Sequence, residues 1–160
     1  MEAGWSIRKA GVEDLDELIR LRLALLRSTR EVERFEDEEA LVAKTRRYLE
    51  RAIPEGRFHA WVAEAEGRLV ASSGIMPFER PPVPGNMAGL EMHILNMYTE
   101  PGWRGRGIAR ALFTELMRFS REQGAGRIWL HATDEGRPLY ESVGFKPNPT
   151  ALEWTPPEGA

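Results

Sequence analysis

Residues 103–109 read Trp-Arg-Gly-Arg-Gly-Ile-Ala and lie between an apolar, strand-like run and a long amphipathic stretch. A strand that ends in a glycine turn and then opens a helix leaves several backbone N–H groups pointing at one spot. The helix dipole adds partial positive charge there, and Arg104 and Arg106 add formal charge. Gly105 and Gly107 let the backbone approach a ligand closely, because they carry no Cβ. The stretch therefore predicts a site for a phosphate or pyrophosphate group.

The composition is that of one ordinary globular domain. Of the 160 residues, 42 % are hydrophobic and 29 % are charged. We predict a single domain over residues 1–155 and a short tail over residues 156–160. The formal net charge of −3, with no dominant basic stripe, argues against nucleic acid as a partner. No run has the length of a membrane span or the form of a signal peptide, so we expect a cytoplasmic protein with no membrane partner.

The hydrophobic pattern alternates between the period of strands and that of helices. Strands are predicted at Trp5–Arg8, Arg57–Glu64, Arg68–Pro77, Leu90–Thr99, Arg127–Ala132 and from Gly144 to about Trp154. Helices are predicted at Val12–Ser28, Asp37–Ala52, Gly105–Gln123 and Glu135–Val143. This order predicts an α/β fold, with a mixed, mostly antiparallel sheet of six to seven strands flanked by about four helices.

Residues 96–112 resemble the acetyl-CoA-binding signature of the GNAT N-acetyltransferase superfamily. The family pattern Arg/Gln-x-x-Gly-x-Gly/Ala is filled here by Arg104, Gly107 and Ala109. A second family landmark, a tyrosine followed closely by Gly-Phe, is present as Tyr140 with residues 144–145. The resemblance implies a GNAT-like sheet that is splayed at its central strands, and acetyl-CoA as the co-substrate.

The resemblance also implies how coenzyme A is held. A bulge near residues 96–98 would let the pantetheine arm lie along the gap between two strands, and the glycine turn would hold the pyrophosphate. The family often has an asparagine where this chain has Thr133, and either Thr133 or Asp134 could cap the short helix. The residues expected at the cofactor are Met97, Tyr98, Thr99, Arg104, Gly105, Arg106, Gly107, Ile108, Ala109 and Thr133.

Two residues are candidates for the proton transfers of acyl transfer. Tyr140 occupies the family position that protonates the departing thiolate, although it could instead be a packing residue. Glu91 lies thirteen residues before Arg104, a spacing similar to that of the catalytic glutamate in histone-acetylating members of the family. His93 shares the strand face of Glu91 and could also remove the proton from the amine. Both could equally be surface side chains, with water as the base.

The sequence gives weaker evidence about which residues bind the acceptor amine. Arg22 interrupts the apolar stripe of the first helix, so it either binds a substrate carboxylate or reaches a glutamate or water. His93 is also a candidate substrate contact. The acidic segment Glu31–Glu39 either attracts a cationic amine or merely connects two helices. The proline-rich loop at residues 78–89 is a lid, rigid surface packing or a contact between two copies, which leaves a homodimer open.

The sequence thus predicts an enzyme, an acetyl-CoA-dependent N-acetyltransferase. It would transfer the acetyl group directly to a primary amine of a small molecule or peptide. The chain has no cysteine, which excludes a cysteinyl acyl-enzyme, and its isolated histidines predict no metal site. The alternative is a non-catalytic acyl-CoA sensor or partner module. Such a module would keep the glycine turn that binds the cofactor but would no longer catalyse acetyl transfer.

Overall fold

The computed structural model describes residues 4–29 and 38–157, and its strands form one sheet. The strands, in spatial order, are β1 (Ser6–Lys9), β2 (His59–Ala65), β3 (Arg68–Glu79), β4 (Leu90–Thr99) and β5 (Arg127–Leu130). The first four strands are antiparallel to their neighbours, whereas β5 runs parallel to β4. The predicted mixed, mostly antiparallel sheet is confirmed.

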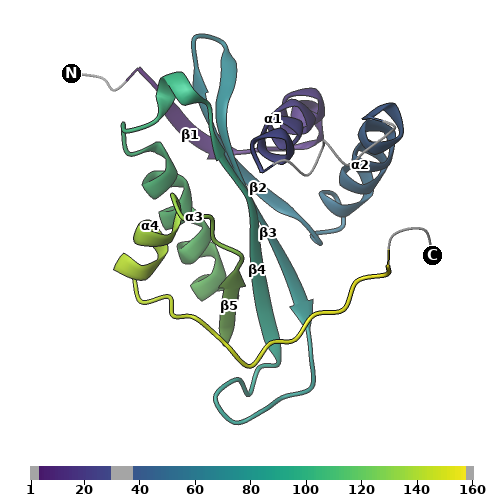
Figure 1. The fold of residues 1–160 in the computed structure, drawn as a ribbon, viewed down its shortest axis with the longest axis vertical. Coiled ribbons are helices and arrows are strands. Elements are labelled where there is room, and N and C mark those ends of the chain that lie inside the picture. The colour runs from purple at the N-terminus through teal and green to yellow at the C-terminus, as the bar shows by residue number, and fades with distance from the viewer. Residues whose placement is uncertain (1–3, 30–37, 158–160) are drawn as a thin grey trace.

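Helices cover both sides of this sheet. They are α1 (Leu15–Ser28), α2 (Glu38–Ala52), α3 (Ile108–Glu122) and α4 (Arg137–Ser142), with short 3-10 turns η1 (Val12–Asp14) and η3 (Pro101–Trp103). Figure 1 shows α1 and α2 on one side of the sheet and α3 and α4 on the other. The parallel pair β4 and β5 is joined by α3, because parallel neighbours need a long crossover.

The core is built where these helices meet the central strands. Residues 69–75 of β3 are buried without a break, because helices cover both faces of that strand. On the α3 side, Met92 and Ile94 of β4 pack with Phe113 and Leu116 of α3. Successive strand residues point to opposite faces, so Glu91 and its neighbours of the same parity point to the α1–α2 side.

The predicted sheet of six to seven strands was wrong, because the described residues form five strands. The strand expected from Gly144 to about Trp154 is absent from the structure of that segment. Prolines at 147 and 149 remove two backbone donors from the ladder. The segment also buries little, since Leu152 is 98 % exposed and Trp154 is 78 % exposed. In Figure 1 it is the yellow coil that leaves α4.

Most element boundaries lie within a few residues of the prediction. The first helix begins as η1 before α1 takes over, and Asp37 lies outside the described residues. β5 ends at Leu130, two residues earlier than predicted, and α4 begins later than predicted. As a result, residues 131–136 are not part of a strand or helix and connect the sheet to α4.

Candidate active site

The turn between β4 and α3 has the geometry of an anion cradle. Gly105 and Gly107 have φ values of 76° and 83°, in the left-handed region where a side chain would be strained. A Cβ built on either glycine would meet no atom within 4 Å, so the backbone there borders open space. α3 starts at Ile108, and the first N–H groups of a helix have no acceptor within it. The turn therefore has the room and the donors that a pyrophosphate needs.

The two arginines of the turn take different positions. The Nε atom of Arg104 donates to the carbonyl of Thr99 at 2.9 Å, and its guanidinium lies 5.7 Å from the centre of the Tyr98 ring. The guanidinium of Arg106 instead lies over the Trp103 ring, at 4.5 Å. Arg104 is thus held against the strand that leads into the cradle, whereas Arg106 is held by residues 102–103, just before the cradle glycines.

The sheet opens into a gap beside this cradle. β4 and β5 pair from Glu91 opposite Arg127 to Ile94 opposite Leu130, and the ladder stops there although β4 continues to Thr99. The remaining half of β4 has no strand beside it on that edge within the described residues. This is the splay at the central strands that the resemblance implied.

A bulge in β4 accompanies the gap. Between the Ser72–Tyr98 pair and the Gly74–Leu95 pair, β3 advances two residues while β4 advances three. Asn96 supplies the turn in the backbone, with φ at 58°, a conformation that asparagine tolerates better than most residues. The bulge expected near residues 96–98 is confirmed.

A cavity of about 500 Å³ lies at this gap and is lined mainly by four parts of the chain. Its walls are the C-terminal end of α1, the last residues of β4, the start of α3 and the segment around α4. The predicted site residues that line it are Met97, Tyr98, Thr99, Arg104, Ala109, Thr133 and Tyr140. Ile108 is 1 % exposed and packs in the core, so only its backbone can serve a ligand.

Tyr140 brings a phenol to this cavity. Its side chain is buried, and its ring meets the ring of Phe113 edge-on at 5.2 Å. Its hydroxyl makes no hydrogen bond to any residue in the part of the chain that the structure describes. Burial raises the pKa of Tyr140 above its ordinary value, so the hydroxyl keeps its proton at neutral pH. In this geometry Tyr140 can therefore both pack against its neighbours and serve as a proton donor.

Comparison with known proteins assigns the chain to a protein family. The model of the acetyltransferase (GNAT) family matches residues 20–145, well over half of the chain. The chain belongs to the GNAT family of acetyltransferases. Enzymes of this family use acetyl-CoA as their co-substrate, and the open glycine cradle fits its pyrophosphate.

Two solved structures match this GNAT chain over nearly its whole length. A predicted acetyltransferase from Clostridium acetobutylicum, crystallised with acetyl-CoA, is 30 % identical, with a TM-score of 0.84. The match covers 94 % of this chain and 96 % of that one. A GCN5-related N-acetyltransferase from Ralstonia eutropha JMP134 is also 30 % identical, with a TM-score of 0.80 and coverage of 98 % and 100 %.

Curated relatives match over shorter spans. Glucosamine 6-phosphate N-acetyltransferase of Trypanosoma brucei brucei is 31 % identical over 80 residues, which are 50 % of this chain and 52 % of the relative. Human N-acetyltransferase 8B is 30 % identical over 89 residues, or 54 % of this chain and 37 % of the relative. The matches thus span about half or less of the length of these relatives.

Thr133 is fixed by the turn that leads into α4. Its Oγ1 atom accepts a hydrogen bond from the backbone N–H of Gly136 at 3.1 Å, and its carbonyl accepts one from Arg137 at 3.0 Å. These hydrogen bonds close the turn before α4, whereas the helix itself has Gly136 at its N-cap and no side-chain cap, so the expected helix cap from Thr133 or Asp134 was wrong. Pro138 lies in the first turn of α4, where its missing N–H costs no helical hydrogen bond.

Glu91 is placed differently from the expectation for a free base. It is 2 % exposed, it lies on the face of β4 away from Tyr140, and it is not part of the cavity wall. Arg80 donates to its Oε2 at 2.5 Å and Arg127 to its Oε1 at 2.9 Å. Burial acts to raise the pKa of Glu91, but the two arginine hydrogen bonds outweigh it and hold this pKa below its ordinary value.

His93 lies next to Glu91 on the same face of β4. Its ring stacks on the indole of Trp129, with 4.0 Å between the ring centres. Burial and the neighbouring charge of His131 lower the pKa of His93, so its imidazole is neutral at pH 7. The sequence marked His93 but missed Trp129, because only the parallel pairing of β4 and β5 brings the two together.

Arg22 has a protein partner rather than an empty site. Its Nη1 atom donates to Oδ1 of Asn96 at 2.5 Å, which ties α1 to the bulge of β4. The protein partner predicted for an inward-facing arginine therefore exists, and one such partner is the side-chain amide of Asn96. A substrate contact for Arg22 stays a prediction.

Several cavity residues had no signal in the sequence. Leu25, Ser28 and Thr29 come from the end of α1, and Ser72 comes from β3. Their positions are set by how α1 packs across β3 and β4, which no local motif reports. Of the acidic segment at residues 31–39, residues 31–37 lie outside the described structure.

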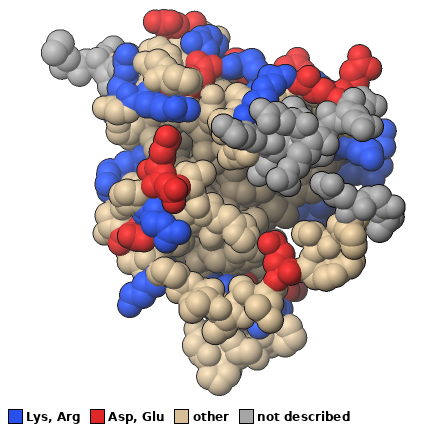
Figure 2. All heavy atoms as spheres, in the orientation of Figure 1, with Lys and Arg blue, Asp and Glu red and all other residues tan. Residues whose placement is uncertain are grey.

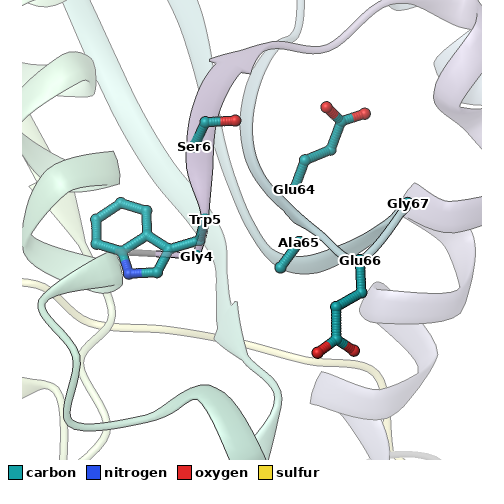
Figure 3. A pocket seen from close by; sticks show the side chains of 7 residues that line it. All are labelled: Gly4, Trp5, Ser6, Glu64, Ala65, Glu66 and Gly67. Atoms are coloured by element: carbon teal, nitrogen blue, oxygen red, sulfur yellow. The ribbon is translucent and has the colours of Figure 1, made fainter. Parts of the chain in front are cut away.

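A second hollow lies far from this chemistry, at the start of β1 and the turn between β2 and β3. In Figure 3 the side chains of Glu64 and Glu66 point away from one another, and Trp5 points away from both. Glu64 is already paired with Arg8, at 2.9 Å. The hollow therefore offers no converging polar groups.

Two further findings concern residues 4–29 and 38–157, the part of the chain that the structure describes. Within these ranges no group of three or more histidines or carboxylates could hold a metal ion. No helix there is long and apolar enough to cross a membrane. On the face shown in Figure 2, basic and acidic side chains are interspersed rather than gathered into one basic track.

Proposed function

We propose that this GNAT protein is an N-acetyltransferase, which transfers an acetyl group from acetyl-CoA directly to the primary amine of a small molecule or peptide. The observation that carries the proposal is that one cavity is shared by a protonated phenol, a bulged strand and an anion cradle. The name of one relative, glucosamine 6-phosphate N-acetyltransferase, is consistent with a small-molecule amine as acceptor.

The cavity walls suggest which residues would hold the cofactor. The backbone N–H groups of residues 105–109, together with the charge of Arg104, would bind the pyrophosphate. The exposed edge of β4 at Met97 and Thr99 would bind the pantetheine arm as a strand would. When bound, acetyl-CoA supplies a thioester carbonyl and a thiol leaving group. Because the Thr133 hydroxyl is engaged by Gly136, its contact with the cofactor would be through the backbone.

Tyr140 would act as the general acid. A departing thiolate gains from a nearby proton donor, and the raised pKa of Tyr140 keeps its proton available. The negative charge that develops on the acetyl oxygen needs N–H donors, which the backbone at the β4 bulge can supply because no β5 strand pairs with it there.

The acceptor amine must lose a proton before it attacks. An alkyl amine with a pKa of ~10.4 is almost entirely protonated at pH 7. Glu91 is a weak candidate for this base, since both of its oxygens accept hydrogen bonds from arginines and its pKa is lowered. We therefore assign the base to water or to the neutral imidazole of His93, and keep Glu91 as the alternative.

A thiol-release assay tests this proposal. The purified protein is mixed with acetyl-CoA and a panel of primary amines, and free thiol is followed together with mass spectrometry of the acetylated product. We expect release that depends on both the amine and Tyr140. Tight binding of coenzyme A without release for any amine would instead identify a non-catalytic acyl-CoA-binding module.

A further inference from the structure

Four aromatic rings meet on the α1–α2 side of the sheet, where β4 and β5 are paired. His93 and Trp129 are opposite each other in this pairing, and their rings are stacked with an angle of 11° between them. His131 and Phe78 meet the Trp129 ring edge-on, at 5.7 Å and 6.3 Å between ring centres. We call Phe78, His93, Trp129 and His131 the ring cluster.

The ring cluster is not part of the hydrophobic core. Trp129 packs against none of the three core clusters of the described residues and is only partly buried. Its Nε1–H is buried without a hydrogen-bond acceptor in the described part of the chain, although buried indole N–H groups usually have one. Phe78 is 38 % exposed. Core packing therefore does not account for these rings, which present aromatic surface to solvent.

Positive charge lies at one end of the ring cluster. Arg127 is two residues from Trp129, with its guanidinium 5.5 Å from the centre of the indole, and Arg80 lies beside it on Glu91. The side chains of Arg80 and Arg127 are 43 % and 40 % exposed, respectively, whereas the side chain of Glu91 between them is 2 % exposed. The surface that a ligand meets here is cationic, because the balancing charge is buried.

The other end of the ring cluster adjoins the gap in the sheet. The β4–β5 ladder stops at Leu130, and His131 is the next residue along the chain. Thr133, which lines the cavity of Tyr140, follows two residues later, a distance of about 7 Å in extended chain. A molecule that lies on the rings can thus pass one end into the gap.

We propose that the ring cluster selects the acceptor: an aminoalkyl group on a planar aromatic ring that carries an anionic group at the end away from the amine. The amine would enter the gap, the ring would lie on Trp129 and its neighbours, and the anion would meet Arg127 and Arg80. This inference rests on the proposed function and adds a substrate class to it. The reaction is unchanged: the C–S bond of the thioester breaks, an amide C–N bond forms, and the amine proton leaves to the base.

Four commercial amines separate the two features that the ring cluster would recognise, the planar ring and the anionic group. 4-(Aminomethyl)benzoate has the amine, the aromatic ring and the carboxylate. trans-4-(Aminomethyl)cyclohexanecarboxylate keeps both charges without a planar ring, benzylamine keeps the ring without the anion, and spermidine is cationic only. We expect kcat/KM to be at least about fivefold higher for the benzoate than for each of the others, because ring contact and charge pairing each contribute.

Two variants assign the preference to the cluster, and a third is the control. Trp129→Leu should bring the benzoate down to the level of the cyclohexane analogue, and Arg127→Gln should bring it down to the level of benzylamine. Trp154→Leu changes an exposed tryptophan elsewhere and should leave the preference intact. Thermal unfolding and coenzyme A affinity confirm that each variant is folded.

Calorimetry of the four amines on the protein saturated with coenzyme A provides a readout that does not need turnover. Tighter binding of the benzoate, lost in Trp129→Leu, supports the inference even if no amine is acetylated, in which case only the proposed function fails. Three outcomes would overturn the inference. The first is equal affinity and equal kcat/KM for the benzoate and cyclohexane compounds. The others are a benzoate preference that survives in Trp129→Leu and a preference for spermidine.

Discussion

Arg22 on α1 donates a 2.5 Å hydrogen bond to the side-chain oxygen of Asn96, the residue with φ of 58° at the bulge of β4. The contact joins two segments that are 74 residues apart in the sequence. It fixes the side chain of the bulge residue, which lies just beyond the last pair of β4 with β5. The bulge beside the gap is thus tied to α1, a helix on the other side of the sheet from α3.

The backbone of Asn96 can be tested by a pair of substitutions. Asn96→Ala and Asn96→Gly both remove the acceptor of the Arg22 hydrogen bond, but only alanine is strained at positive φ. We expect Asn96→Ala to lower the free energy of unfolding by about 1 kcal/mol more than Asn96→Gly, measured by urea denaturation. Equal losses would show that the bulge relaxes to another conformation.

The hydroxyl of Tyr140 should matter for turnover and not for folding. Tyr140→Phe keeps the ring contacts with Phe113 and Phe145 and removes only the proton donor. We expect kcat to fall roughly 10²-fold, with little change in coenzyme A affinity or thermal stability. Tyr48→Phe, on exposed α2, is the matched control. An unchanged kcat in Tyr140→Phe would remove the tyrosine from the mechanism.

The glycine cradle should tolerate no side chain. Gly107→Val adds a branched side chain at φ of 83° where the ligand backbone contact is expected, so coenzyme A binding should be lost. Gly124→Val, at φ of 79° beyond the other end of α3, carries similar strain away from the cradle. Calorimetry should show normal coenzyme A affinity for the control; normal affinity in a folded Gly107→Val would refute the cradle.

Glu91 should act on stability more than on catalysis. Its folded-state pKa is lowered, so its ionised form stabilises the fold above its ordinary pKa of 4.5, and this contribution is lost as the pH falls through the folded value. Glu91→Gln should therefore cost about 2 kcal/mol at pH 7 and clearly less at acidic pH, measured by urea denaturation across that range.

Turnover of the same variant decides the role of Glu91. With water or His93 as the base, Glu91→Gln should keep kcat within several-fold of the parent. A loss of 10²-fold or more, in a variant that binds coenzyme A normally, would restore Glu91 as the general base.

The structure differs most from the sequence prediction where tertiary packing or prolines outweigh the local hydrophobic pattern and motif spacing. The run after Gly144 has apolar residues at strand-like spacing, but its prolines remove ladder donors, and the segment stays exposed. Glu91 has the spacing of a family base, yet two arginines bind it, and Arg80 comes from the loop after β3. Strand alternation predicted that Glu91 and His93 share a face; it gave no account of what covers that face.

The sequence by itself determined the donor side of this protein. A cradle for a pyrophosphate is a local object: two glycines at positive φ, a strand before them and a helix after them suffice, and all lie within some 30 residues of the chain. Tertiary structure alone decided the surface where we propose that the acceptor binds. The ring cluster, the burial of Glu91 and the Arg22–Asn96 contact arise because strands and helices distant in sequence pack together, and side chains from different elements acquire their environment only then.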